Sequence, residues 1–252
     1  MEPHIETSTT VHYECDKCED TGWIHYVKDG YSYSCPCDCV RMRSARKRIE
    51  DSGLAGEIKR LTFDSYRVYE PWQEKIKTSV QGYVDKIMEM DGTNERKPWL
   101  FIGGNSGAGK THICTAACGK LLENGYPVIY MQWIPEVRRL KESIGDDDAY
   151  EELIDRYAGA KILYIDDLFK QTTKDAPRPT DADVRIAFEI INARYIANLP
   201  TIITSEWHLV PELLSVDEGT FSRVYEKTKE GGFNFKIARD SSKNMRLRME
   251  GE

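Results

Sequence analysis

The chain has 252 residues, of which 40% are hydrophobic and 31% are charged, and it carries a formal charge of −7. This composition supports a folded core and excludes a disordered or collagen-like chain. No run approaches the ~20 apolar residues that a membrane-spanning helix needs, and residues 1–10 lack the pattern of a signal peptide. We therefore expect a cytoplasmic protein without a membrane partner, built from one full domain and one small module.

Five of the seven cysteines lie close together near the N-terminus: Cys15, Cys18, Cys35, Cys37 and Cys39. In a reducing compartment, clustered cysteines are more often metal ligands than disulfides. The first two have turn spacing that lets both sulfurs face one ion, and the other three offer a second pair whose identity the spacing leaves open. Because four thiolates hold zinc tetrahedrally, we expect a zinc module. The alternatives are reduced thiols without metal and a ligand from His12 or His25.

A basic run directly follows the last of these cysteines and falls in a helical pattern over residues 40–50: Arg41, Arg43, Arg46, Lys47 and Arg48. Contact with single-stranded DNA or with an acidic partner would use such a run, and a solvated helix face is the alternative. Residues 53–71 have no clear period, and we expect a linker there.

From Trp72 onward, apolar residues recur every three or four positions, which predicts an amphipathic helix that ends at Asp91-Gly92. Short apolar runs then predict strands at 99–102, 128–131, 162–165, 201–204 and 233–238. Helical patterns separate most of them, at 110–123, 135–158, 181–198 and 208–229. This alternation predicts an α/β fold with a largely parallel central sheet flanked by helices on both faces.

The clearest motif follows the first of these strands and opens a helix: Gly104-Asn105-Ser106-Gly107-Ala108-Gly109-Lys110-Thr111. It fits the pattern G-x-x-x-x-G-K-[ST] of a phosphate-binding loop, in the strand–loop–helix context that the pattern requires. Glycines let backbone N–H groups point toward phosphates, and the helix N-terminus adds partial positive charge. We expect Lys110 to reach the β- and γ-phosphates of ATP and the Thr111 hydroxyl to bind Mg²⁺.

A second acidic motif ends the strand at 162–165, where Asp166 and Asp167 stand at its carboxyl end. Parallel sheets place their ligands at this edge. We expect Asp166 to bind Mg²⁺ and Asp167 to orient or deprotonate the attacking water. The alternative is that these two acidic residues end the strand and have no catalytic role.

With these motifs in hand, the chain resembles the AAA+ ATPases, specifically the DnaC/DnaI-type loaders of the bacterial replicative helicase in their phage or prophage form. The resemblance extends over nearly the whole chain and rests on the segments 15–22, 37–39, 52–54, 104–111, 164–168, 199–206, 222–226 and 243–246. It implies a zinc-binding, helicase-interacting module over 1–52 and a P-loop AAA+ domain over 72–252. It also favours Cys37 and Cys39 as the second zinc pair, with Cys35 able to replace either.

The resemblance further implies roles for single residues near the C-terminus. Arg223 stands where the family carries an arginine finger that completes the ATP site of a neighbouring subunit. Thr204 and Ser205 stand at the sensor position, where the family's Thr-Ser-Asn reads Thr-Ser-Glu. An ionised carboxylate at Glu206 cannot donate a hydrogen bond to phosphate, so the sensor role stays with Ser205 or Thr204. Arg246 is either a second sensor or a surface arginine.

The function that the resemblance implies is ATP-dependent loading of the replicative helicase onto single-stranded DNA, with slow ATP hydrolysis. Its cofactors would be ATP or ADP, Mg²⁺ and Zn²⁺. Its partners would be a DnaB-like hexameric helicase, single-stranded DNA and further copies of the chain, joined through the AAA+ domain. The alternatives are a transposition-helper ATPase of the IstB-like type and a nucleotide-dependent adaptor with little hydrolysis.

Overall fold

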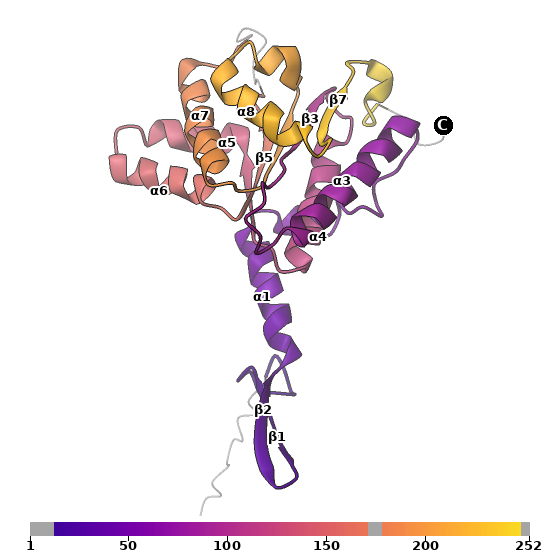
Figure 1. The fold of residues 1–252 in the computed structure, drawn as a ribbon, viewed down its shortest axis with the longest axis vertical. Coiled ribbons are helices and arrows are strands. Elements are labelled where there is room, and N and C mark those ends of the chain that lie inside the picture. Colours follow the sequence, from indigo (N-terminus) through magenta and orange to yellow (C-terminus); the bar gives the residue numbers. More distant parts are fainter. Residues whose placement is uncertain (1–12, 171–177, 248–252) are drawn as a thin grey trace, which may run out of the picture. The chain divides into compact units, whose positions relative to one another are not determined.

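The computed structural model describes residues 13–170 and 178–247, and the side chains of Arg41, Met42, Ala45 and Arg46 lie outside this description. The chain divides into two compact units, residues 1–47 and 48–252 (Figure 1). Each unit is described by itself.

The first unit is built on a hairpin and a cysteine cluster. Strands β1 (Trp23–Lys28) and β2 (Tyr31–Pro36) pair antiparallel around a two-residue turn at Asp29 and Gly30. Both turn residues have positive φ, 52° and 80°, which suits the twist of a tight hairpin. Helix α1 (Asp38–Asp51) begins in this unit directly after Cys37. Its core consists of cysteines with Ile24 beside them, so side-chain packing alone gives this unit little stability.

The second unit contains the predicted parallel sheet. Its five strands are β3 (Leu100–Gly104), β4 (Val128–Gln132), β5 (Ile162–Leu168), β6 (Thr201–Ser205) and β7 (Asn234–Ile237). Their order is β4-β5-β6-β3-β7, and every neighbouring pair is parallel. The three middle strands are almost wholly buried, which explains their continuous apolar runs. The predicted α/β class is confirmed.

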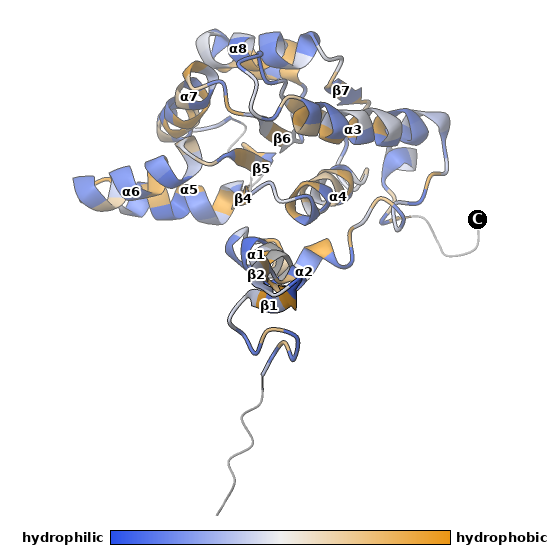
Figure 2. Ribbon diagram, turned by 60° about the horizontal axis from the view of Figure 1, so that its bottom comes forward, coloured by the Kyte–Doolittle hydropathy of each residue, from blue (hydrophilic) through white to orange (hydrophobic). Residues whose placement is uncertain are grey.

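Helices cover both faces of this sheet (Figures 1 and 2). One face carries α3 (Pro71–Glu89) and α4 (Lys110–Glu123), packed with Leu100, Ile102 and Ile202. The other face carries α5 (Trp133–Glu142), α6 (Asp147–Ala158), α7 (Asp181–Ile196) and α8 (Glu218–Lys229). These helices share a second core with Phe101, Ile165 and Ile203. Alternate residues of each strand therefore pack into two separate hydrophobic cores, one on each face of the sheet.

Two helical patterns each form two shorter elements. The pattern over 135–158 breaks before α6, where the Asp146 side chain accepts the Ala149 N–H at 3.2 Å as an N-cap. The pattern over 208–229 gives a short turn (Leu209–Leu213), in which Val210 has extended dihedral angles, and then α8, which Asp217 caps. A 3₁₀ turn (Ser241–Lys243) follows β7.

Residues 53–71, expected as a linker, lie within the second unit. Leu54, Ile58 of the short α2 (Ala55–Ile58) and Tyr66 are buried in the core on the α3 and α4 face. The boundary between units falls at residue 47 rather than 52. The aromatic residues of this segment act as core packing, because the surface beside α4 is apolar and needs to be covered.

Within residues 13–170 and 178–247, no helix has both the length and the apolar character that crossing a bilayer demands.

Candidate functional site

The phosphate loop joins β3 to α4, as its sequence context predicted. Gly107 has a φ of 72°, and a Cβ there would lie 1.9 Å from Oδ1 of Asn244. Gly109 has a φ of 84° and forms the left-handed N-cap of α4. The positive φ at Gly107 and Gly109 favours glycine at both positions, and the loop leads directly into the N-terminus of a 14-residue helix.

Lys110 is the buried cation of this loop. Its Nζ donates to the carbonyl oxygens of Gly104 and Asn105, both at 2.8 Å, and the residue is only 6% exposed. Burial lowers the pKa of Lys110, although the charges of Asp167 and Glu206 oppose this shift. A buried ammonium that rests on carbonyl oxygens gains stability when a polyphosphate approaches.

The side chain of Asp166 is held by four hydroxyl groups. Thr111 Oγ1 lies 3.1 Å from Oδ1 and 3.3 Å from Oδ2, and Thr204 Oγ1 donates to Oδ1 at 2.5 Å. Tyr164 donates to Oδ1 at 2.7 Å and Tyr130 to Oδ2 at 3.0 Å. Burial and the charge of Asp166 raise the pKa of both tyrosines, so both remain donors. The carboxylate is thus fixed beside the Thr111 hydroxyl.

Sequence reasoning missed the two tyrosines. Tyr164 was visible in principle, because it precedes Asp166 by two residues on one strand and therefore shares its face. Tyr130 lies opposite Tyr164 in the β4–β5 register, which only the paired sheet reveals.

Asp167 points away from Asp166, although the two are adjacent. Its φ is 57°, and the β5–β6 register shifts between Ile165 and Leu168. The Asp167 N–H donates to Thr204 Oγ1 at 2.9 Å, which fixes this turn of the backbone. The carboxylate pairs with Lys170 Nζ at 2.7 Å. One acid is therefore buried beside Thr111, and the other faces a cavity.

That cavity has a volume of about 370 Å³ and lies over the phosphate loop. Its lining includes the predicted residues Ser106, Gly107, Gly109, Lys110, Thr111, Asp167 and Arg246. It also includes residues that the sequence analysis did not assign: Glu57, Arg60, Leu61, His112, Lys170 and Met245. Glu206, doubted as a sensor, lines it as well.

Three predicted residues lie elsewhere. Ser205 donates its hydroxyl to the Leu168 carbonyl at 2.7 Å and is fully buried, so it braces the end of β5. Thr204 contacts Asp166 rather than the cavity. Arg223 lies on α8, where it donates to the Gly219 carbonyl and stacks over the Tyr195 ring at 5.7 Å. An arginine that serves a neighbouring copy need not reach its own phosphate loop.

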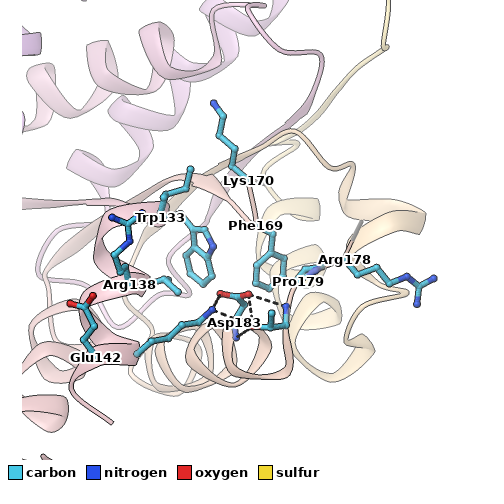
Figure 3. Close-up of a pocket in the computed structure, with 12 residues that line it drawn as sticks. Trp133, Arg138, Glu142, Phe169, Lys170, Arg178, Pro179 and Asp183 are labelled. Atoms are coloured by element: carbon cyan, nitrogen blue, oxygen red, sulfur yellow. Dashed lines mark hydrogen bonds and ion pairs between the residues drawn. The ribbon is translucent and has the colours of Figure 1, made fainter. Parts of the chain in front are cut away.

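A second cavity has a volume of about 440 Å³, and Figure 3 shows the residues that line it. Trp133 and Phe169 form its apolar floor, and Asp183 pairs with Lys141 at 2.7 Å within it. Lys170 lines both cavities. Its side chain extends away from the aromatic floor in Figure 3.

In the first unit, the structure brings together the sulfurs of Cys15, Cys18, Cys37 and Cys39, all within 4.8 Å of one another. Two of these separations are 3.8 Å (Cys15–Cys37) and 3.4 Å (Cys18–Cys39). A tetrahedral site with Zn–S bonds of ~2.3 Å places sulfurs roughly 3.8 Å apart, so the donor set fits zinc. Cys35 and His25 are outside the cluster, and His12 lies outside the described residues.

The thiols of this cluster differ in pKa. A backbone hydrogen bond from Lys17 lowers the pKa of Cys15 to about 7, which favours a thiolate. The hydrogen bond with Cys18, followed by burial, raises the pKa of Cys39 to about 12. Four adjacent thiols cannot all ionise unless a positive ion offsets their charge.

Comparisons with known proteins show which proteins this chain is similar to. A family model described as Novel STAND NTPase 3 matches residues 89–249. The phage-like element PBSX protein XkdC of Bacillus subtilis (strain 168) is 29% identical over 216 residues, which cover 85% of this chain and 79% of that protein. The protein YqaM of the same strain is 28% identical over 200 residues, or 79% of this chain and 62% of YqaM.

Solved structures show the same fold. A DnaC helicase loader is 20% identical with a TM-score of 0.53, over 73% of this chain and 99% of that one. A putative primosome component from Streptococcus pyogenes serotype M3 is 17% identical with a TM-score of 0.58, over 78% and 97%. DnaI is 17% identical with a TM-score of 0.54, over 75% and 92%. The predicted architecture, a parallel sheet flanked by helices, is thereby confirmed.

Proposed function

The chain belongs to the Novel STAND NTPase 3 family, and from that premise we propose that it is an ATP-dependent loader of a replicative DNA helicase. The observation that carries the proposal is the joining of Thr111 and Asp166 beneath a phosphate loop, in a fold shared with DnaC and DnaI. The separate cysteine module supports a loader rather than a transposition helper, whose relatives generally lack such a module.

The chemistry of the site suits ATP hydrolysis. Lys110 and the N–H groups of the loop bind the β- and γ-phosphates, and Thr111 with Asp166 provides the hard oxygen ligands that suit Mg²⁺. A bound Mg²⁺ neutralises phosphate charge. Asp167 faces the cavity, where its carboxylate accepts a proton from the attacking water. Arg223 of a neighbouring copy stabilises the charge on the transferred phosphoryl group, so hydrolysis depends on self-association.

The first unit grips the helicase. Its hairpin exposes four aromatic side chains, of which Tyr26, Tyr31 and Tyr33 share one face and Trp23 lies on the other. The rings of Tyr26 and Tyr33 stack with centroids 5.6 Å apart. Exposed aromatic clusters of this kind are typical of protein interfaces. The cysteine tetrad binds Zn²⁺ and holds the base of the hairpin. Reduced zinc thiolates fit a cytoplasmic protein.

Single-stranded DNA is the second macromolecular partner that we propose. In the basic run, Arg43 is committed to an ion pair with Asp20, which leaves Lys47 and Arg48 as the described cations for phosphate contact. The side chains of Arg41 and Arg46 lie outside the description.

Co-purification with the host's replicative helicase tests the proposal. We expect ATP to change the yield of the complex for the wild type and to have no effect on Lys110→Ala, which removes the phosphate-binding cation. Failure of a folded, zinc-loaded sample to bind the helicase would overturn the loader assignment and leave ATP hydrolysis intact.

A further inference from the structure

Lys170 is a second cation at the phosphate cavity. It follows the carboxyl end of β5 by two residues, and its Nζ lies 2.7 Å from Asp167 Oδ2 and 3.7 Å from Glu206 Oε1. All three side chains line the 370 Å³ cavity, as do Lys110 and Thr111. Lys170 thus shares one cavity with the residues that would bind the triphosphate, but it belongs to the segment after β5 and not to the phosphate loop.

The surroundings keep Lys170 charged and in place. Burial alone would lower the pKa of Lys170, but the hydrogen bond and charge of Asp167, together with the charge of Glu206, outweigh it and raise the pKa. The backbone of Glu206 is held in place, because its main-chain carbonyl accepts a hydrogen bond from Arg239 Nη2 at 3.1 Å. The two carboxylates therefore hold an ammonium group over the cavity.

We propose that Lys170 is a γ-phosphate ligand that Glu206 holds ready, and that it leaves Asp167 when it binds the phosphate. This inference rests on the proposed ATP site. A carboxylate at Glu206 cannot donate to phosphate, whereas the ammonium that it holds has three donors. A γ-phosphate competes with Asp167 for this cation, so ATP itself frees the acid that accepts the proton of water. ADP has no γ-phosphate and leaves the ion pair closed.

The test distinguishes a direct contact between Lys170 and the γ-phosphate from an effect in which Lys170 only neutralises the charge of Asp167. Dissociation constants of fluorescent ATP and ADP are measured with Mg²⁺ in the Asp167→Asn background, where no charge on residue 167 needs neutralising. Adding Lys170→Met should weaken ATP binding by about tenfold or more, the value of a charged hydrogen bond, and change ADP binding by less than about twofold. Lys170→Arg should keep the preference for ATP.

The matched control is Lys141→Met in the same background. Lys141 also forms a 2.7 Å ion pair with an aspartate, Asp183, but it lines the other cavity, so both affinities should stay unchanged. Glu206→Gln, a second route if Lys170→Met misfolds, should reduce the affinity for ATP while sparing that for ADP.

Equal losses for ATP and ADP, or no loss in the Asp167→Asn background, would overturn the role of Lys170 while the ATP site stands. If the wild type binds neither nucleotide, the proposed ATP site fails and the inference fails with it.

Discussion

The hydroxyl of Thr111 lies 3.1 Å from Oδ1 of Asp166, although 55 positions separate the two residues in the sequence. Thr111 belongs to the first turn of α4, and Asp166 to β5. The strand that precedes α4 is separated from β5 by β6 in the sheet, so parallel pairing is what brings these side chains together. The buried carboxylate of Asp166 therefore contacts the phosphate loop, and the next residue, Asp167, is the acid that faces the cavity.

Replacing that neighbouring acid should stop hydrolysis and spare binding. Asp167→Asn removes the proton acceptor, and general-base catalysis typically contributes 10²–10⁴-fold, so we expect kcat to fall by about 100-fold or more. Binding of ATP should not weaken, since Asn cannot repel phosphate. Phosphate release and nucleotide titration measure the two effects. Asp183→Asn, an ion-paired aspartate outside the phosphate cavity, is the control, and wild-type turnover by Asp167→Asn would remove Asp167 from the mechanism.

The sequence predicted the strands of the sheet more completely than it predicted the residues of the site. Runs such as residues 99–102 and 162–165 are apolar on both faces, which identifies buried strands without any knowledge of their partners. The hairpin over 23–36 escaped detection because its aromatic side chains are exposed rather than alternating with a buried face. Its Asp29-Gly30 turn was visible, but the strands on either side were not.

Site residues that depend on long-range geometry were the ones missed. Lys170 follows β5 in a stretch without a motif, and nothing in the sequence places its ammonium against Glu206, 36 residues later. The choice among Cys35, Cys37 and Cys39 likewise needed the folded unit, which brings the sulfurs of Cys37 and Cys39 to those of Cys15 and Cys18 and leaves Cys35 outside the cluster. Motif spacing predicts which residue types meet, and packing decides which atoms do.

Loss of zinc should unfold the first unit alone. Cys18 is buried within the cluster, so Cys18→Ser removes one of four ligands, and we expect less than one zinc per chain and early proteolysis within residues 1–47. ATP hydrolysis by residues 48–252 should persist. Metal analysis and limited proteolysis provide the readout. Cys35→Ser should keep its zinc, and equal zinc loss in both variants would show that the ligand set differs from the tetrad.

The exposed hairpin aromatics should matter for helicase capture and not for ATP turnover. Tyr26→Ser combined with Tyr31→Ser removes two exposed rings from β1 and β2, and we expect helicase binding to weaken by at least about tenfold. Zinc content should be unchanged, since neither tyrosine contacts a cysteine sulfur in the cluster. Tyr225→Ser, an exposed tyrosine on α8, is the matched control. Full binding by the double variant would place the helicase contact elsewhere.

Mixing two inactive variants tests whether Arg223 acts on a neighbour. Arg223→Ala lacks the finger, and Lys110→Ala lacks a working phosphate loop, so each alone should be nearly inactive. In a mixture, the intact loop of one copy meets the intact finger of the other, and we expect ATP hydrolysis above the sum of the separate rates. Lys229→Ala, on the same helix, should hydrolyse ATP normally. Purely additive rates in the mixture would leave Arg223 a residue of the α8 surface.

Arg194 should be among the most costly residues to replace for stability. It is fully buried on α7, and its guanidinium donates to five acceptors at 2.6–3.1 Å, namely Thr201 Oγ1 and the carbonyls of Tyr157, Ala158, Ala160 and Pro200. Arg194→Met leaves buried carbonyls without donors, so we expect the free energy of unfolding to fall by about 3–5 kcal/mol.

Chemical denaturation measures this loss, and Arg185→Met, at an exposed position on the same helix, should cost less than about 0.5 kcal/mol. Arg194→Lys should fall between them, because an ammonium keeps the charge but has three donors rather than five. If Arg194→Met unfolds at the same denaturant concentration as the wild type, water must replace the lost donors, and the junction of α6, α7 and β6 is looser than its hydrogen bonds indicate.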